Sequence, residues 1–222
     1  NYPHDIQRRS AEVIAQDAGI SRSAIVRLCQ KLGYQGWSEF KYAYLHEPAL
    51  AASAQEHNIL TRYENIIQKL RQGVAADQLQ TIVQIIHRAN RVITLGNYHS
   101  GMSAQQMAFR LNRSGIDSHF MNDTSQMECY VSLIRSNDVV FIFSLSGDPL
   151  YGSLVEQYVQ RGASVILITM STRTTLAKLV TQTVVLPFLS HERCNYLLDD
   201  AITFFIFIEM IIEALHEESS KQ

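Results

Sequence analysis

The sequence predicts an α/β fold, in which a doubly wound five-stranded parallel sheet follows a small all-helical domain. Three observations lead to this fold class. Five short β-rich runs alternate with helical stretches in the second part of the chain, as in parallel sheets covered by helices. The runs at 139–143 and 165–168 are apolar at every position, which is typical of central strands buried on both faces. A linker-like stretch around Pro48 separates this part from a shorter N-terminal part.

Hydrophobic spacing sets the expected elements in order. Two helices come first, because apolar residues recur at helical spacing from Ile59 to Leu70 and from Leu79 to Ile86. Strands are expected at 91–95, 117–121, 138–143, 164–168 and 183–187, with helices between them at 100–112, 125–135, 151–161 and 174–180. A last helix at 196–216 is apolar around nearly its whole circumference, and we expect it to lie in a subunit interface.

Composition and charge narrow the class of protein. The 222 residues are 46% hydrophobic and 18% charged, which excludes a disordered chain and fits one large domain with a small one. The net charge of −2 argues against a general nucleic-acid binder, but this charge is unevenly divided. Residues 1–45 carry six Lys and Arg against four acids, and the remainder carries 13 against 17. We therefore expect a basic domain at 1–46, a linker at 47–57 and an acidic domain at 58–222.

The cysteines and the apolar segments indicate the compartment. Cys29, Cys129 and Cys194 lie far apart, so we expect neither disulfides nor a metal site, and a cytoplasmic location. The most apolar stretch, 201–212, is shorter than the roughly 20 residues of a membrane span, and we expect no membrane association. The chain begins at Asn1 without an initiator Met, and we expect it to be a fragment.

Residues 11–32 have the pattern of a helix-turn-helix. Gly19 can adopt the positive φ of a sharp helix exit, and Ser21 is a good cap for the second helix. The residues expected to face inward are Val13, Ile14, Ile20, Ile25, Leu28, Cys29 and Leu32. The outer face carries donors able to reach base edges in a DNA major groove, namely Arg22, Ser23, Arg27, Gln30 and Lys31. The alternative is an ordinary helical hairpin with a solvated polar face.

The residues that follow this motif favour DNA binding. The segment 31–41 reads KLGYQGWSEFK, and ISRSAIVRLC precedes it at 20–29. Together they closely resemble the N-terminal domain of the RpiR family of bacterial transcription regulators, which reads "vS…tIvRfcrkLGfkGysefK" at this place. The resemblance implies binding to a double-stranded DNA operator. Ala24 replaces a Thr of the family, and the family's first helix is missing here, so we expect this fragment to bind DNA weakly.

Three loops at strand ends have the composition of an anion site. Strands one, three and four are followed by residues 96–101, 144–149 and 169–174, which contain small hydroxyl residues and glycines before helix starts. Ligands of doubly wound sheets bind at the carboxyl ends of the strands, and helix N-termini favour phosphate groups. The alternative is that Ser100, Ser146 and Thr174 only cap helices.

The same loops resemble those of the sugar isomerase (SIS) domain, the partner domain in the RpiR family. The usual G-x-G-x-S is GNYHS at 96–100, I-S-x-S-G-x-T is FSLSGDP at 143–149, and the later I-T and S-x-L-A-k patterns are IT at 168–169 and TTLAK at 174–178. This resemblance implies a flavodoxin-like sheet of SIS type that binds a sugar phosphate. The ligand-binding residues it implies are Gly96, Asn97, His99, Ser100, Ser144, Ser146, Gly147 and Asp148.

Two departures from the SIS pattern fall in this site. Tyr98 replaces the second glycine, and Pro149 replaces a phosphate-binding Thr and removes an N–H donor. Three outcomes are open: a different ligand, weaker binding, or no ligand. A further alternative is that Tyr98 and His99 stack on, or hydrogen-bond to, a larger or less phosphorylated sugar.

Competing functions have weaker support in the sequence. A sugar isomerase needs a general base, but no motif gives that role to any of His99, His119, His191, Glu128 and Glu192. A dinucleotide site fails the G-x-G-x-x-G requirement, and an SIS domain used only for dimerisation remains open. We expect a non-enzymatic transcription regulator without a cofactor, a homodimer or homotetramer. We expect a bound sugar phosphate to change the relative orientation of the two helix-turn-helix domains of the dimer, and only one orientation matches operator half-sites about 34 Å apart.

Overall fold

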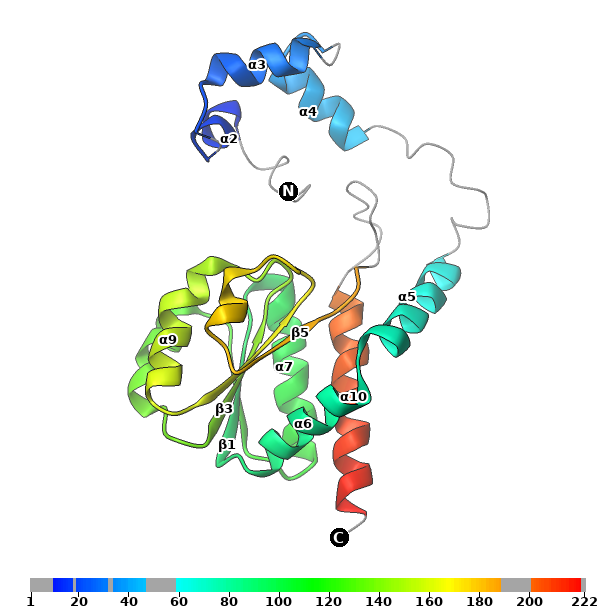
Figure 1. The fold of residues 1–222 in the computed structure, drawn as a ribbon, viewed down its shortest axis with the longest axis vertical. Coiled ribbons are helices and arrows are strands. Elements are labelled where there is room, and N and C mark those ends of the chain that lie inside the picture. Colours follow the sequence, from blue (N-terminus) through cyan, green and yellow to red (C-terminus); the bar gives the residue numbers. More distant parts are fainter. Residues whose placement is uncertain (1–9, 18, 32–33, 47–58, 189–200, 221–222) are drawn as a thin grey trace. The chain divides into compact units, whose positions relative to one another are not determined.

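The computed structural model describes residues 10–17, 19–31, 34–46, 59–188 and 201–220. It contains two compact units, one built from helices α2 to α4 and the other around a sheet (Figure 1). The linker predicted at 47–57 lies outside the described residues.

The N-terminal unit, called the head, contains α2 (Ala11–Asp17), α3 (Arg22–Lys31) and α4 (Trp37–His46). In the turn between α2 and α3, Gly19 has a φ of +64°, a conformation that strains any residue with a side chain. Ser21 caps α3, because its Oγ accepts a hydrogen bond from the N–H of Ala24 at 3.2 Å. The predicted helix-turn-helix is present, with Gly19 and Ser21 in their predicted roles.

The core of the head is small. Ala11, Ala15, Ile25 and Cys29 are buried, and the partly buried side chains packed on them are Ile14, Tyr34, Trp37 and Phe40. The expectation that Val13, Ile20 and Leu28 face inward is wrong, since these side chains are 42%, 46% and 53% exposed. Helices of 7 to 10 residues do not offer enough surface to cover both sides of the α2–α3 pair.

The second unit, called the sensor domain, is a five-stranded sheet with helices on both faces. Its helices of eight or more residues are α5 (Ile59–Gly73), α6 (Ala76–His87), α7 (Tyr98–Arg113), α9 (Gly152–Gln160) and α10 (Ala201–Ser219). The strands are β1 (Arg91–Leu95), β2 (Ser118–Met121), β3 (Asp138–Phe143), β4 (Ser164–Thr169) and β5 (Gln182–Val185). Shorter helical segments are α8 (Thr124–Tyr130), η1 (Val131–Leu133), η2 (Pro149–Tyr151) and η3 (Thr175–Lys178).

The strand order is β2-β1-β3-β4-β5, and each neighbouring pair is parallel. This order confirms the predicted flavodoxin-like, doubly wound sheet, whose switch point lies between β1 and β3. The register places Leu95 of β1 beside Ile142 of β3, and Phe143 of β3 beside Ile168 of β4. The carboxyl ends of β1, β3 and β4 therefore share one edge of the sheet, and the three candidate loops follow them.

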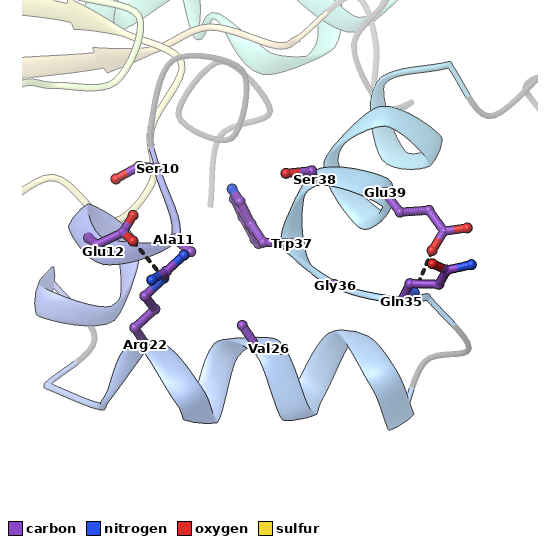
Figure 2. Close-up of a pocket in the computed structure, with 10 residues that line it drawn as sticks. All are labelled: Ser10, Ala11, Glu12, Arg22, Val26, Gln35, Gly36, Trp37, Ser38 and Glu39. Atoms are coloured by element: carbon purple, nitrogen blue, oxygen red, sulfur yellow. Dashed lines mark hydrogen bonds and ion pairs between the residues drawn. The ribbon is translucent and has the colours of Figure 1, made fainter.

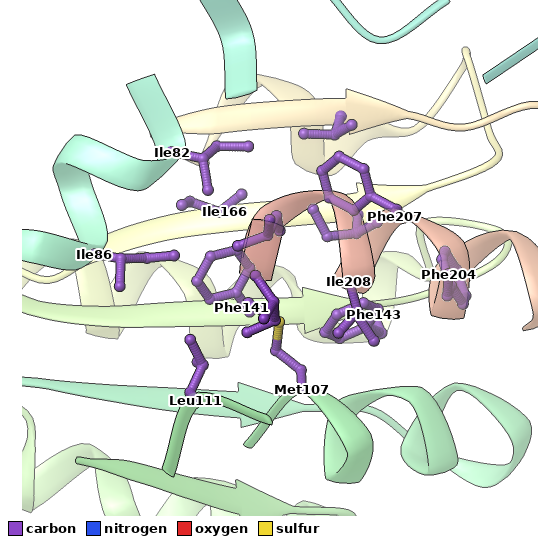
Figure 3. Packing of buried hydrophobic residues seen from close by; sticks show 14 of the residues in the cluster. Ile82, Ile86, Met107, Leu111, Phe141, Phe143, Ile166, Phe204, Phe207 and Ile208 are labelled. Carbon is purple, nitrogen blue, oxygen red and sulfur yellow. The ribbon is translucent and has the colours of Figure 1, made fainter. Parts of the chain in front are cut away.

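Alternate residues of each central strand enter two separate cores. Phe141 and Phe143 of β3 pack with α6, α7 and α10, whereas Val140 and Ile142 pack on the other face with α8 and α9. Figure 3 shows the first core, in which the rings of Phe143 and Phe204 meet edge to face at a centroid distance of 5.4 Å. Burial on both faces explains why this strand is apolar throughout.

Helix α10 is largely buried within its own chain. It contacts α6 and α7, and Arg110 Nη2 of α7 lies 2.6 Å from Glu209 Oε2 of α10. Packing inside one chain therefore accounts for most of the apolar circumference that we attributed to a subunit interface. The apolar residues left half-buried are Ile202, Phe205, Ile206 and Met210. Residues 196–200, predicted to begin this helix, lie outside the described residues.

Within the described ranges, the helices are too short or too polar for any of them to cross a membrane.

An ion-pair cluster joins β1 and β3 at the amino edge of the sheet, opposite the candidate loops. The Asp138 carboxylate is 1% exposed and accepts hydrogen bonds from Arg91 Nε and Nη2 at 3.1 and 2.9 Å, and from the Arg135 N–H at 2.9 Å. The Arg91 guanidinium also donates to the Tyr130 hydroxyl and the Leu133 carbonyl. The hydrogen bond to Asp138 raises the pKa of Arg91. We call this the amino-edge cluster.

Candidate functional site

The loop after β1 turns tightly into α7. A Cβ at Gly96 would lie 2.5 Å from the Ser100 carbonyl oxygen, closer than side-chain carbons approach backbone atoms. Two residues later, Tyr98 has a φ of +52°, in the left-handed region that favours glycine. The chain therefore places a tyrosine in a glycine-like backbone conformation, at a cost of roughly 1–2 kcal/mol.

The first turn of α7 faces the carboxyl edge of the sheet with its N–H groups. The helix begins at Tyr98, and the Asn97 side chain makes no capping hydrogen bond. Ser100 lies inside this first turn and is 8% exposed, so it does not cap the helix from outside. Its hydroxyl has no hydrogen-bond partner within the described part of the chain, which leaves it available to a ligand.

The loop after β3 is held by its own hydrogen bonds. Ser144 Oγ, almost fully buried, accepts from the Asp148 N–H at 3.0 Å, so the Ser144 hydroxyl proton can be donated elsewhere. Asp148 Oδ1 accepts from the Leu150 N–H at 2.9 Å and caps η2, which Pro149 begins. Pro149 thus fits the first position of a helical turn, where a missing N–H costs little.

Two threonines tie the loop after β4 to the loop after β3. Thr174 Oγ1 donates to the Gly147 carbonyl at 2.8 Å, and Thr169 Oγ1 donates to the Leu145 carbonyl at 3.2 Å. Gly147 has a φ of +63°, and a Cβ there would lie 2.5 Å from the Thr174 side chain. Thr174 Oγ1 also accepts a hydrogen bond from the Leu176 N–H, so Thr174 both caps η3 and links the two loops.

Tyr151 lies beneath these loops. The side chain is 8% exposed, and burial, with a smaller contribution from the Asp148 carboxylate, raises the pKa of the Tyr151 phenol to about 12. The Asn97 backbone acts on the same phenol in the opposite direction. The phenol is therefore neutral at physiological pH and lies between the loops after β1 and β3. Tyr151 was not among the residues predicted from the sequence, although it lies only three residues after Asp148.

The eight predicted ligand-binding residues fall on two adjacent loops. Gly96, Ser100, Ser144 and Gly147 are buried, Asn97 and Asp148 are half-buried, and His99 and Ser146 are exposed. Neither loop contains Lys or Arg, and Arg173 lies exposed in the third loop. The site can still bind a phosphate ester without a basic side chain, because hydroxyls, backbone N–H groups and the N-terminus of α7 all favour an anion.

Among the described residues, His99 is the only candidate catalytic residue that lies on these loops. His119 lies on the edge strand β2, where its Nε2 is 3.2 Å from Asp117 Oδ1, and Glu128 is exposed on α8. His191 and Glu192 lie outside the described residues. Among the residues that the structure describes, no three His, Cys, Asp or Glu side chains gather as a metal site would require.

The predicted DNA-binding residues lie on the solvent side of α3. Arg27, Gln30 and Lys31 are exposed, and these three make no ion pair within the described ranges. Arg22 Nε lies 2.6 Å from Glu12 Oε1 of α2, and Ser23 Oγ lies 2.9 Å from Ser21 Oγ. Three of the five residues thus make no ion pair with the described residues, whereas Arg22 and Ser23 already have partners in the head.

A pocket of about 570 Å³ opens between the three helices of the head. Figure 2 shows Arg22 reaching Glu12 at one end and Gln35 bonded to Glu39 at the other, with Trp37 between them. The Trp37 Nε1 is buried and has no hydrogen-bond partner among the described residues. This pocket was not predicted from the sequence, and its lining residues all belong to the head.

Comparison with known proteins assigns both units. The helix-turn-helix domain of the rpiR family matches residues 1–50, and the SIS domain matches residues 85–214. The fold is similar to the Vibrio vulnificus NanR protein complexed with ManNAc-6P, with a TM-score of 0.63, 21% identity, and coverage of 98% of this chain and 83% of that chain. It is also similar to the sugar isomerase domain of an RpiR transcription factor from Sphaerobacter thermophilus, with a TM-score of 0.65, 16% identity, and coverage of 77% and 93%.

Curated relatives have similar domains in longer proteins. The chain is 29% identical over 154 residues to the HTH-type transcriptional regulator GlvR of Bacillus subtilis, covering 67% of this chain and 58% of GlvR. It is 28% identical over 195 residues to the bifunctional protein glk of Burkholderia orbicola, covering 82% of this chain but only 30% of that protein. With more than half of its length matched by the SIS domain, and an rpiR-type helix-turn-helix before it, the chain belongs to the SIS-domain proteins of the RpiR family.

Proposed function

We propose that this chain is a transcription regulator whose sensor domain binds a phosphorylated sugar and thereby alters the binding of its head to an operator. One observation carries the proposal: a helix-turn-helix with unengaged donors and a phosphate-type loop site occur in the same chain. The Vibrio vulnificus NanR protein, whose fold is similar over 98% of this chain, was solved in complex with ManNAc-6P. An enzymatic role has less support, because His99 is the only described candidate base on the loops. His119 and Glu128 lie elsewhere, and His191 and Glu192 lie outside the described residues.

The ligand site of this proposal comprises the loops after β1 and β3. Ser100, Ser144 and Ser146 donate hydroxyl protons to phosphate oxygens, and the first turn of α7 adds backbone N–H groups. Gly96 lets the first loop approach the Ser100 backbone in α7, and Gly147 lets the second loop approach the Thr174 side chain, because a Cβ would collide at either position. The two loops contain no Lys or Arg and one carboxylate, that of Asp148, which predicts modest affinity for a phosphate and suits a sensor that must release its ligand.

The DNA-binding part of the proposal rests on α3. Arg27 and Lys31 are exposed cations one helical turn apart, and Gln30 lies between them with both amide donor and acceptor groups. The Arg22–Glu12 ion pair is exposed on both sides, so DNA phosphates can displace Glu12 at little cost.

We place a homodimer interface on α7 and α10 of the sensor domain. Met102 and Phe109 of α7 are 59% and 55% exposed, and α10 adjoins α7 with Phe205 and Ile206 half-buried. Exposed apolar side chains on two packed helices form a surface that a second copy can cover. Two joined sensor domains carry two heads, which could meet operator half-sites about 34 Å apart.

A thermal-shift panel of sugar phosphates tests the sensor function. A ligand at 100 times its Kd should stabilise the sensor domain by about 2.7 kcal/mol, and Ser146→Ala should reduce this gain without changing the stability of the free protein, since Ser146 is exposed. Ser136→Ala, which changes an exposed serine just before β3 at the opposite edge of the sheet, is the matched control. If no sugar phosphate stabilises the wild type, the sensor domain serves dimerisation alone.

A mobility-shift titration at fixed salt tests the head. Arg27→Ala in the complete protein should weaken operator binding and reduce the slope of log Kd against log salt by about 1, if Arg27 contacts a phosphate. Arg161→Ala, an exposed Arg beyond α9, changes the net charge equally and should have no effect. Equal affinity of Arg27→Ala and wild type would remove α3 from the interface.

A further inference from the structure

The two candidate ligand loops lack a permanent positive charge to match a phosphate ester. The loops after β1 and β3 contain one carboxylate, that of Asp148, and no Lys or Arg. The charge of Asp148 acts between these loops, because it contributes to the raised pKa of the Tyr151 phenol. A phosphate monoester carries nearly two negative charges at pH 7, so Asp148 repels it there. A cation beside the loops would offset this repulsion.

The topology places many cations of the sensor domain at the other edge of the sheet. Strands of a parallel sheet begin, and the helices before them end, at the amino edge. The residues at such positions include Arg88, Arg91, Arg113, Arg135 and Arg161. The three loops that follow β1, β3 and β4 contain one Lys or Arg between them, and this is Arg173 in the loop after β4.

The backbone around Arg173 is fixed against the loop after β3. Its neighbour Thr174 contacts Gly147, because Thr174 Oγ1 donates a hydrogen bond to the Gly147 carbonyl at 2.8 Å. On the other side, the Arg173 N–H donates to Ser171 Oγ at 3.3 Å. Arg173 is therefore one residue away from a direct contact with a ligand loop, in a segment that its own hydrogen bonds hold in shape.

The side chain of Arg173, in contrast to its backbone, is free. It is exposed, and its guanidinium makes no hydrogen bond or ion pair with the described residues. Arg91, at the amino edge, is instead paired with Asp138 at 2.9 Å. The Arg173 guanidinium can thus turn toward an anion bound beside Gly147 without breaking another interaction.

We infer that Arg173 pairs with the phosphate of the bound sugar and so selects phosphorylated over neutral sugars. This inference rests on the proposed sugar-phosphate site and adds a residue from a third loop to it. A planar guanidinium donates two parallel hydrogen bonds to phosphate oxygens, whereas the hydroxyls of Ser100 and Ser146 donate one each. Arg173 therefore supplies the charge that the two loops lack, and offsets the repulsion by Asp148.

Isothermal titration of the complete protein with glucose 6-phosphate, fructose 6-phosphate and the two unphosphorylated sugars tests the inference. Arg173→Ala should weaken the binding of a sugar phosphate by about tenfold, as the loss of a hydrogen bond to a charged group does. Arg173→Lys keeps the charge but not the planar fork, and should lose less. Arg161→Ala removes an exposed Arg at the amino edge, changes the net charge equally, and should leave the affinity unchanged.

The salt dependence distinguishes charge pairing from a change in loop shape. The Debye length falls from about 30 Å at an ionic strength of about 0.01 M to about 3 Å at about 1 M. The advantage of the wild type over Arg173→Ala should therefore shrink at high salt. Its advantage over Ser146→Ala, which loses a neutral donor, should change little.

The outcomes separate this inference from the proposed function. If a sugar phosphate binds, Ser146→Ala weakens it and Arg173→Ala does not, the inference is overturned and the sugar-phosphate site stands. A loss in Arg173→Ala that is equal at low and high salt also overturns it, because a distorted loop then explains the loss. If no sugar phosphate binds the wild type, the site and the inference are both overturned.

Discussion

Replacing Asp138 with Ala should strongly destabilise the sensor domain. The substitution leaves the Arg91 guanidinium without its carboxylate and the Arg135 N–H without an acceptor, in a place where Asp138 is 1% exposed. Breaking a buried ion pair by removing one partner costs about 3–5 kcal/mol. The Arg91 side chain is 21% exposed and keeps its bond to Tyr130, so we expect the lower value, about 3 kcal/mol.

Urea unfolding followed by circular dichroism measures this loss, and thermal unfolding should show a fall of about 6–12 °C. Trp37, the one tryptophan of the sequence, lies in the head, so its fluorescence provides an internal control that should not move. Asp117→Ala removes an exposed carboxylate that pairs with His119 and contributes only the smallest of the interactions that raise the pKa of Arg91, and it should change stability by less than about 0.5 kcal/mol. A loss below about 1 kcal/mol for Asp138→Ala would refute the reasoning.

Three further predictions follow from single contacts. Burial raises the pKa of the Tyr151 phenol to about 12 from an ordinary 10, so the unfolded chain loses this proton at lower pH than the folded chain. The free energy of unfolding should therefore fall between pH 10 and 12. Urea titrations at several pH values should show this fall to be smaller by about 2 kcal/mol in Tyr151→Phe. Ser103→Ala should stabilise the sensor domain by about 1 kcal/mol in the same assay, since the Ser103 hydroxyl is fully buried and has no partner among the described residues. A loss of stability would show that this hydroxyl makes a hydrogen bond. Gly147→Ala should lower the free energy of unfolding by at least about 1 kcal/mol more than Gly115→Ala. Both glycines have positive φ, but only at Gly147 would a Cβ collide with the Thr174 side chain. Equal losses for the two variants would contradict that collision.

The sequence predicted the central strands best, because burial on both faces leaves a continuous apolar run. The bounds of β1 and β3 are as predicted, whereas the edge strands β2 and β5 are shorter than predicted at 117–121 and 183–187. Edge strands have fewer buried positions, and their ends depend on neighbours that a sequence pattern does not contain. The predicted helix at 174–180 is a single turn, η3, and that at 125–135 divides into α8 and η1.

The sequence predicted that the candidate loops lie together, but not their detailed conformation. The loops after β1 and β3 share one edge of the sheet as predicted, because that arrangement follows from parallel topology. The conformation of Tyr98 could not be predicted, since a non-glycine residue with positive φ is decided by the turn around it. In the head, the exposure of Val13, Ile20 and Leu28 depends on how few helices cover them, which spacing alone does not reveal.

The position of the amino-edge cluster has a consequence for the evolution of the sensor domain. Asp138 and Arg91 join the two central strands at the end away from the ligand loops. Residues at the opposite edge, such as Tyr98 and Pro149, can therefore vary while this buried ion pair between the strands stays in place. A family built in this way can exchange one effector for another by drift in its loops, while selection on folding acts mainly at the other end of the same strands.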